Sequence, residues 1–249
     1  MRCPLCRATG DPTDVRGADG RGYHLCSACR LIFADPRHHL PAGEEKARYA
    51  NHRNSAGNRG YVGFLNRVLL PTLPYLDKSM RGLDYGCGPG PTLSRLVRRR
   101  GIACDDYDPL FERRPLRPPY DFIFSTECFE HFRSPDRDIR RICGLLRPGG
   151  VLSVMTERWT TIERFAEWHY TRDPTHVSFY HDRTFDYLGQ RHGLEPLWRD
   201  EDRVAVFRKM RKRPSRPGGG EGAVKRGDPR AEMTRKARLC RQITTKQTD

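Results

Sequence analysis

The fold of this chain is decided by residues 82–90, which read Gly-Leu-Asp-Tyr-Gly-Cys-Gly-Pro-Gly. A short apolar run leads into Asp84, three glycines follow at alternate positions, and residues 93–97 then carry apolar side chains at helical spacing. This order predicts a buried strand, a glycine-rich turn and a helix that ends near Gly101. Glycines let the backbone approach a ligand without a Cβ atom in the way, and an acidic side chain at a strand end can accept a hydrogen bond from it. The stretch therefore predicts a ligand site in an α/β domain.

The glycine spacing distinguishes this loop from two other nucleotide-binding loops. A dinucleotide-binding loop has the pattern G-x-G-x-x-G, whereas Gly86, Gly88 and Gly90 lie two residues apart. A phosphate loop of the Walker type needs Gly-Lys-Ser/Thr, which does not occur in this sequence. A glycine-rich loop by itself also fits an ordinary tight turn, so its function depends on the segments that follow.

The segments that follow alternate between strand and helix patterns. Strands are predicted at 102–107, 120–127 and 151–155, and a closing antiparallel hairpin at 194–199 and 203–207. Alternation of this kind predicts a doubly wound, mainly parallel sheet with helices on both faces. A ligand then binds at the carboxyl ends of the strands, where Gly86, Gly88, Asp108 and Glu127 would converge.

These segments occur in the same order as the motifs of the class I S-adenosylmethionine-dependent methyltransferases, and the chain resembles this family over most of 82–207. The resemblance implies a Rossmann-like fold and S-adenosylmethionine as cofactor. It implies that residues 84–90 line the methionine end of the cofactor and that Asp108 holds both ribose hydroxyls. The implied cofactor-binding residues are Asp84, Gly86, Gly88, Gly90, Asp108, Thr126 and Glu127.

One stretch departs from the family pattern. Only residues 109–120 separate Asp108 from Asp121, and they include Pro115, Pro118 and Pro119. A crossover to a further parallel strand needs a dozen or more residues for the connection alone. The third strand is therefore predicted to be reduced or missing, and no adenine-contacting residue can be named.

Four of the nine cysteines form two CxxC motifs near the N-terminus. Cys3 and Cys6 are separated from Cys26 and Cys29 by a 19-residue loop, which is the spacing of a four-thiolate zinc ribbon. Four sulfur ligands close the tetrahedron, so the predicted role of Zn²⁺ is structural. A pair of redox CxxC motifs is the alternative, although no βαβ pattern surrounds either motif. His24 could in principle replace one ligand. Of the five other cysteines, those at 87, 104, 128 and 143 fit small buried residues better than nucleophiles.

The acceptor side of the predicted site depends on residues 168–180, which follow the strand predicted at 151–155. Methyl transfer requires alignment of the acceptor and, for an O–H or N–H group, removal of a proton. An imidazole titrates near working pH, so the candidate bases are His176 first, then His169 and His131. Alternatively, His176 belongs to a capped turn and satisfies the backbone, and Glu127 or His131 serves as the acceptor-side group. The aromatic side chains Trp168, Tyr170 and Tyr180 could form a wall against a planar acceptor or contact the sulfonium cation.

The positive charge of the chain is concentrated in its tail. The formal net charge is +15, and residues 208–249 hold 14 basic and 4 acidic side chains, against 32 and 27 in residues 1–207. Residues 214–220 read Pro-Ser-Arg-Pro-Gly-Gly-Gly, a composition typical of disorder. A small-molecule acceptor is the favoured prediction. The alternative is an RNA methyltransferase that holds RNA through the ribbon and the tail, because some rRNA methyltransferases also join a four-cysteine module to this fold.

We expect four regions: a zinc ribbon at 1–35, a helical connector at 36–80, a methyltransferase domain at 81–208 and a basic disordered tail at 209–249. Apolar residues at helical spacing over 61–69 predict a helix in the connector that stops at Pro71. No apolar run approaches the 18 or so residues that a membrane span needs, and the first residues lack the apolar core of a secretory signal. The expectation is a cytoplasmic protein without a membrane partner.

Overall fold

The computed structural model describes residues 1–50 and 57–211, and its centre is a six-stranded sheet with the order β5-β4-β6-β7-β10-β9. The strands β5, β4, β6 and β7 are parallel, and β10 runs antiparallel to both β7 and β9. This is the predicted Rossmann-like, mainly parallel arrangement, closed by the predicted hairpin. The strands are β4 (Arg81–Tyr85), β5 (Ala103–Tyr107), β6 (Tyr120–Thr126), β7 (Leu146–Met155), β9 (Leu194–Arg199) and β10 (Val204–Lys209).

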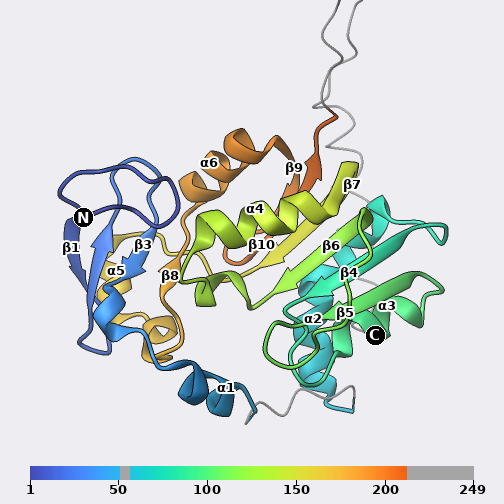
Figure 1. Ribbon diagram of the computed structural model, residues 1–249, viewed down its shortest axis with the longest axis horizontal. Helices are drawn as coiled ribbons and strands as arrows, with labels where there is room; N and C mark the ends of the chain where they lie inside the picture. The colour runs from blue at the N-terminus through green and yellow to red at the C-terminus, as the bar shows by residue number, and fades with distance from the viewer. Residues whose placement is uncertain (51–56, 212–249) are drawn as a thin grey trace, which may run out of the picture.

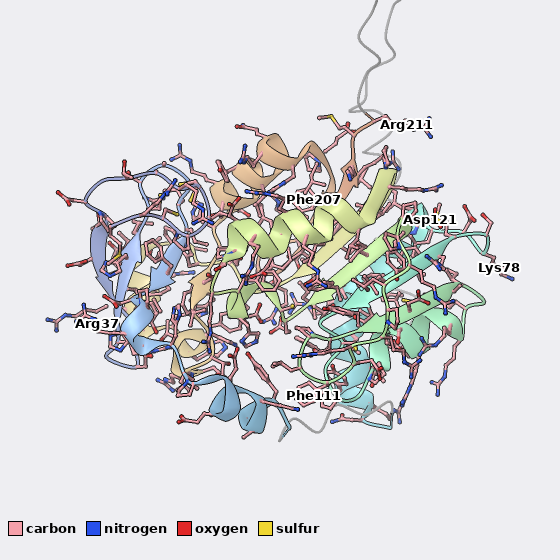
Figure 2. All side chains as sticks on the ribbon, in the orientation of Figure 1. Arg37, Lys78, Phe111, Asp121, Phe207 and Arg211 are labelled. Atoms are coloured by element: carbon pink, nitrogen blue, oxygen red, sulfur yellow. The ribbon has the colours of Figure 1, made fainter. Side chains whose placement is uncertain are left out.

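Helices cover both faces of this sheet (Figure 1). The helices α4 (Pro135–Leu145) and α6 (Asp182–His192) pack with Ile123, Leu152 and Phe207 on one face, where Figure 2 labels Phe207. The helices α2 (Arg59–Thr72) and α3 (Thr92–Arg98) pack with Phe122 and Phe124 on the other. Because alternate residues of a strand point to opposite faces, the apolar run in β6 serves both layers. The sheet is therefore buried on both sides and its strand ends are held rigidly.

The predicted end of α2 at Pro71 is wrong by a short distance. The helix contains Pro71, extends to Thr72, and is followed directly by the 3₁₀ turn η2 (Leu73–Tyr75). A proline in the last turn removes a single helical hydrogen bond, and the Thr72 hydroxyl donates back to the Val68 carbonyl at 2.6 Å. None of the helices in the described ranges combines the length and apolar character that crossing a bilayer requires.

The third strand of the sheet is missing, as the short segment predicted. Residues 109–119 form no strand, so β5 is the outer edge of the sheet. A single bridge between Asp108 and Glu112 folds the start of this segment back on itself. The predicted tail at 209–249 begins with the last residue of β10, and its part from 212 onward lies outside the described residues.

A second, four-stranded antiparallel sheet lies beside the first and has the order β1-β2-β3-β8. Its strands are β1 (Thr13–Arg16), β2 (Gly22–Leu25), β3 (Ile32–Ala34) and β8 (Ser178–Phe179). Ile32 pairs with Phe179 and Phe33 with Ser178, so the N-terminal sheet is completed by a strand that follows β7 in the chain. The domain limits at residues 35, 80 and 208 stay a prediction.

Short helices connect the two sheets. They are η1 (Pro36–His38), α1 (Ala42–Ala50), η3 (Phe129–His131), α5 (Ile162–Glu167) and η4 (His169–Arg172). Figure 1 shows α1 below the space between the two sheets, close to the carboxyl end of β5. The turn η3 follows β6 directly, which places its side chains at the carboxyl edge of the main sheet.

Candidate active site

A cavity of about 530 Å³ lies at the carboxyl ends of β4, β5 and β6. One half is lined by the glycine loop and by the side chains predicted to bind a cofactor. The other half is lined by η3, by His176 and by α1, which contributes Glu45 and Tyr49. This is the switch-point position at which open α/β sheets bind ligands.

The glycine loop leaves open space toward the cavity. Gly86 and Gly88 have φ angles of 83° and 63°, in the left-handed region that favours glycine. A Cβ atom on Gly86 would lie 2.6 Å from the Sγ atom of Cys128, whereas one on Gly88 would meet no atom within 4 Å. Gly88 and Pro89 line the cavity, and Gly90 is not among the described residues that do so. A ligand can therefore approach the backbone at Gly88 directly.

The Asp108 carboxylate connects three segments of the cavity wall. Its Oδ2 atom accepts from the Gly88 amide at 3.0 Å, and its Oδ1 atom accepts from the Leu110 and Phe111 amides at 2.7 and 3.2 Å. The side chain is mostly buried but lines the cavity, where its remaining lone pairs can accept from a ligand. Leu110 and Phe111, the second of which Figure 2 labels, add an apolar wall next to it. The Lys46 ammonium group of α1 lies 5.8 Å from the centroid of the Phe111 ring.

Asp84 is buried at the end of β4 and accepts from the Ser94 amide at 3.2 Å. Burial, together with the nearby carboxylate of Asp106, raises the pKa of Asp84 to about 7. The ordinary pKa of this side chain is near 4, so the folded protein holds an extra proton between these two values.

We expect the Asp84→Asn variant to gain stability relative to the natural protein as the pH rises from 5 to 8. Between pH 4 and 7 the unfolded state releases the Asp84 proton while the folded state keeps it, so this group lowers the free energy of unfolding as the pH increases. The amide has no such proton. Thermal unfolding of both proteins across this range measures the effect, and a stability difference that is independent of pH would contradict it.

Thr126, the last residue of β6, and Glu127 after it also line the cavity. Glu127 has a φ angle of 48°, and its amide donates to the Met155 carbonyl at 2.7 Å. The Glu127 Oε1 atom lies 3.6 Å from the Arg203 guanidinium, beyond hydrogen-bond distance. Burial, reinforced by the carboxylate of Glu130, raises the pKa of Glu127 well above its usual range.

The sequence analysis missed Glu130 as a site residue, although it follows β6 closely in the chain. Its side chain is fully buried against the cavity, where the Tyr170 hydroxyl donates to Oε1 at 2.6 Å. The Oε2 atom has no hydrogen-bond partner in the part of the chain that the structure describes. The spacing Glu-x-x-Glu-His over 127–131 is the signal that could have identified it, because the turn η3 brings all three side chains to one wall.

His131 and His176 lie side by side in this half, with ring centroids 4.8 Å apart. Each ring places Nδ1 against a backbone carbonyl, that of Thr175 at 3.2 Å for His131 and that of Tyr170 at 2.7 Å for His176. A carbonyl can only accept, so Nδ1 carries a proton in both rings. Burial, aided by His131, lowers the pKa of His176 to about 4, which keeps this ring neutral.

The third histidine and the predicted aromatic wall lie elsewhere. The His169 side chain is 70% exposed, near Glu157, and it is outside the cavity lining formed by the described residues. Tyr170 and Tyr180 are buried and donate to Glu130 and to the Phe129 carbonyl, while the Trp168 indole donates to Glu157. These rings support the cavity wall from behind.

The helix α1 covers the acceptor half and is fastened at two places. Arg48 donates to both carboxylate oxygens of Asp173, at 2.9 and 3.2 Å, and Arg133 donates to Glu45 at 2.6 Å. The Tyr49 ring meets His131 edge to face at a centroid distance of 5.0 Å. No sequence motif predicted this contribution, because it depends on contacts between distant segments.

The four N-terminal cysteines come together in two matching turns. The Sγ atoms of Cys3 and Cys29 are 3.7 Å apart, those of Cys6 and Cys26 are 3.5 Å apart, and all four lie within 4.8 Å of one another. The residue that follows each CxxC motif makes the same hydrogen bond: the Arg7 amide donates to the Cys3 carbonyl and the Arg30 amide to the Cys26 carbonyl. Tetrahedral Zn–S bonds of about 2.3 Å place sulfurs roughly 3.8 Å apart, so the four thiols fit a zinc ion. His24 instead contacts Asp14 and Asp35.

The comparisons with known proteins agree with this geometry. A family model described as "Methyltransferase domain" matches residues 51–197. A malonyl-[acyl-carrier protein] O-methyltransferase from Porphyromonas gingivalis is 31% identical over 88 residues, which cover 28% of this chain and 34% of that protein. A trans-aconitate 2-methyltransferase from Rhodopseudomonas palustris is 33% identical over 109 residues, covering 35% and 42%. The chain thus matches less than half the length of either relative.

Among solved structures, an O-methyltransferase family protein from Burkholderia thailandensis superposes with a TM-score of 0.48 at 15% identity. The superposition covers 68% of this chain and 64% of that one.

Proposed function

Because the chain belongs to the methyltransferase domain family, we propose that it is an enzyme that transfers a methyl group from S-adenosylmethionine to a small-molecule acceptor. The observation that carries the proposal is the two-sided cavity. The glycine loop and Asp108 line one half, and a cluster of buried acidic and imidazole side chains lines the other half under α1.

The residues of the first half fit S-adenosylmethionine, whose sulfonium supplies the methyl group when it is bound. The unobstructed backbone at Gly88 accommodates the methionine end, beside Gly86 and Asp84. The carboxylate of Asp108 accepts from three backbone amides, which leaves a lone pair on Oδ2 for one ribose hydroxyl, and the second hydroxyl would take the place of the longer contact from the Phe111 amide. We assign the adenine contact, which the sequence left open, to Leu110 and Phe111, because they provide an apolar wall next to Asp108.

The acceptor belongs in the second half of the cavity. This half provides acceptors and lone pairs for a polar molecule on Glu127, Glu130, His131 and His176, and α1 lines one side of it. His169 is outside this space, so we leave it out of the proposed site.

A small acceptor is favoured by the cavity volume of about 530 Å³ and by the names of the two curated relatives. These names refer to a malonyl-[acyl-carrier protein] and to trans-aconitate. The RNA acceptor was suggested mainly by the basic tail. That tail lies largely outside the described residues, so the RNA alternative stays a prediction.

Zn²⁺ is the second proposed cofactor, held by Cys3, Cys6, Cys26 and Cys29. Four sulfur ligands leave no open position, so the ion would contribute to folding and not to chemistry. The matching turns around both CxxC motifs support this proposal.

Calorimetric titration of the zinc-loaded full chain with S-adenosylhomocysteine tests the cofactor assignment. We expect saturable binding of one molecule per chain with a micromolar dissociation constant. Absence of binding by folded, zinc-loaded protein would overturn the proposal. Release of S-adenosylhomocysteine from S-adenosylmethionine, with small carboxylic acids and with RNA as competing acceptors, then separates the two acceptor classes.

A further inference from the structure

The acceptor half of the cavity contains a second group of metal-ligating side chains, separate from the cysteines. Glu130, His131 and His176 each offer a ligand atom, and these three atoms lie within 4.8 Å of one another. Metal–nitrogen and metal–oxygen bonds are about 2.0–2.2 Å long, so two ligands at the tetrahedral angle of one ion lie roughly 3.4 Å apart. A bound ion would therefore draw the most widely separated of these atoms together by about 1.4 Å.

The two imidazoles are already oriented as ligands. Metal-binding histidines usually donate one ring N–H to a carbonyl or carboxylate, which fixes the ring and directs the other nitrogen to the ion. His131 and His176 both do this through Nδ1, to the carbonyls of Thr175 and Tyr170. Both residues line the cavity, and the Nε2 atom of His131 lies 3.9 Å from the Oε1 atom of Glu130.

The neighbouring carboxylates need positive charge. The Tyr170 hydroxyl lies 2.6 Å from Glu130 and 3.3 Å from Glu127, but it has a single proton to donate. Glu130 is fully buried, and its Oε2 atom lacks a hydrogen-bond partner among residues 1–50 and 57–211. Arg203 lies 3.6 Å from Glu127 and is also paired with Glu157. A buried anion that is incompletely paired is costly, and a bound cation would remove this cost.

We propose that Glu130, His131 and His176 bind a divalent transition-metal cation in the acceptor half of the cavity. Two imidazoles and one carboxylate favour ions such as Mn²⁺, Fe²⁺, Co²⁺ or Zn²⁺ over Mg²⁺ or Ca²⁺, which prefer oxygen ligands alone. Three protein ligands leave open positions for a water or an acceptor, and Glu127 lines the same cavity.

The role of this cation rests on the proposed function. An acceptor that bears a hydroxyl group next to a second oxygen would occupy the open positions, and the cation would lower the pKa of that hydroxyl so that its proton passes to solvent. His131 and His176 would then act as ligands, in place of the general base predicted from the sequence. The substrate class this implies is a small molecule with two adjacent oxygen donors.

Titration with Mn²⁺, followed by the electron paramagnetic resonance signal of the free ion, tests the site in the zinc-loaded full chain. Mn²⁺ prefers oxygen and nitrogen ligands, so it should leave the four cysteines undisturbed. We expect one saturable Mn²⁺ per chain. The variants Glu130→Gln, His131→Ala and His176→Ala should each weaken binding at least tenfold, because each removes one of three ligands.

Matched controls replace residues of the same types outside the cavity. His38→Ala and Glu167→Gln should bind Mn²⁺ as the natural protein does. Binding of S-adenosylhomocysteine to each variant shows that it is folded. The proposal is overturned if folded, zinc-loaded protein shows no saturable binding at millimolar Mn²⁺, or if binding survives both Glu130→Gln and His176→Ala. Saturable Mn²⁺ binding without S-adenosylhomocysteine binding would support the cation site and count against the proposed function alone.

Discussion

Replacement of Asp108 by alanine is expected to weaken the binding of S-adenosylhomocysteine by about 100-fold, measured by calorimetry. A hydrogen bond from a ribose hydroxyl to a carboxylate is worth about 1.5–3 kcal/mol, and every 1.4 kcal/mol is a factor of about ten in affinity. The variant also loses the contacts that hold Gly88, Leu110 and Phe111 in place. Both losses act on the same ligand, so the effect should be among the largest of any single substitution in the cavity.

Two further variants separate these contributions. Asp105→Ala removes a carboxylate that is 40% exposed and absent from the cavity lining, so it should bind the ligand almost normally. Asp108→Asn keeps an oxygen that can accept from the backbone amides but loses the charge, and its affinity should lie between those of the natural protein and Asp108→Ala. Equal losses in Asp105→Ala and Asp108→Ala would contradict the assignment of Asp108 to the ribose.

Replacement of Cys29 by serine is expected to abolish stoichiometric zinc binding and to destabilise the N-terminal sheet. Structural zinc sites in small modules contribute on the order of 10 kcal/mol to folding, and most of this depends on a complete ligand set. Cys29 is buried, and Ile32 and Phe33 shortly after it pair with β8. Metal analysis and thermal unfolding measure the two effects, and amide hydrogen exchange in β3 and β8 should increase.

The matched control is Cys143→Ser, which changes a buried cysteine of α4 in the main core. This variant should keep one zinc ion per chain even if it is less stable. Full zinc content in Cys29→Ser, or loss of zinc from Cys143→Ser, would show that the ion is not held by the N-terminal cysteines.

The parts of the fold that the sequence predicted are those specified by local patterns. Glycine spacing located the turn after β4, alternation of apolar runs gave the order of strands and helices, and the short prolyl segment after Asp108 showed that no third strand could form. Each of these signals depends on residues close together in the chain, where backbone conformation and periodicity are directly encoded.

The parts that escaped prediction depend on contacts between distant segments. The pairing of β3 with β8 joins residues about 145 positions apart and rests on two residue pairs, which leave no periodic signal. The closure of the cavity by α1 depends on Arg48 meeting Asp173 and Glu45 meeting Arg133. Likewise the assignment of Glu130 to the site depends on its burial and on its contact with Tyr170, 40 residues further along the chain.

The missing third strand also affects how this protein behaves at high concentration. It leaves β5 as an edge, and an exposed edge strand can pair with the edge of another molecule and start aggregation. Here the Asp105 carboxylate on β5 is 40% exposed, whereas Asp106 is paired with Arg98, so two such edges that approached each other would bring two negative charges together. The prolines at 115, 118 and 119 lack the N–H donors that a growing sheet needs. The shortened sheet thus carries its own protection against edge-to-edge self-association.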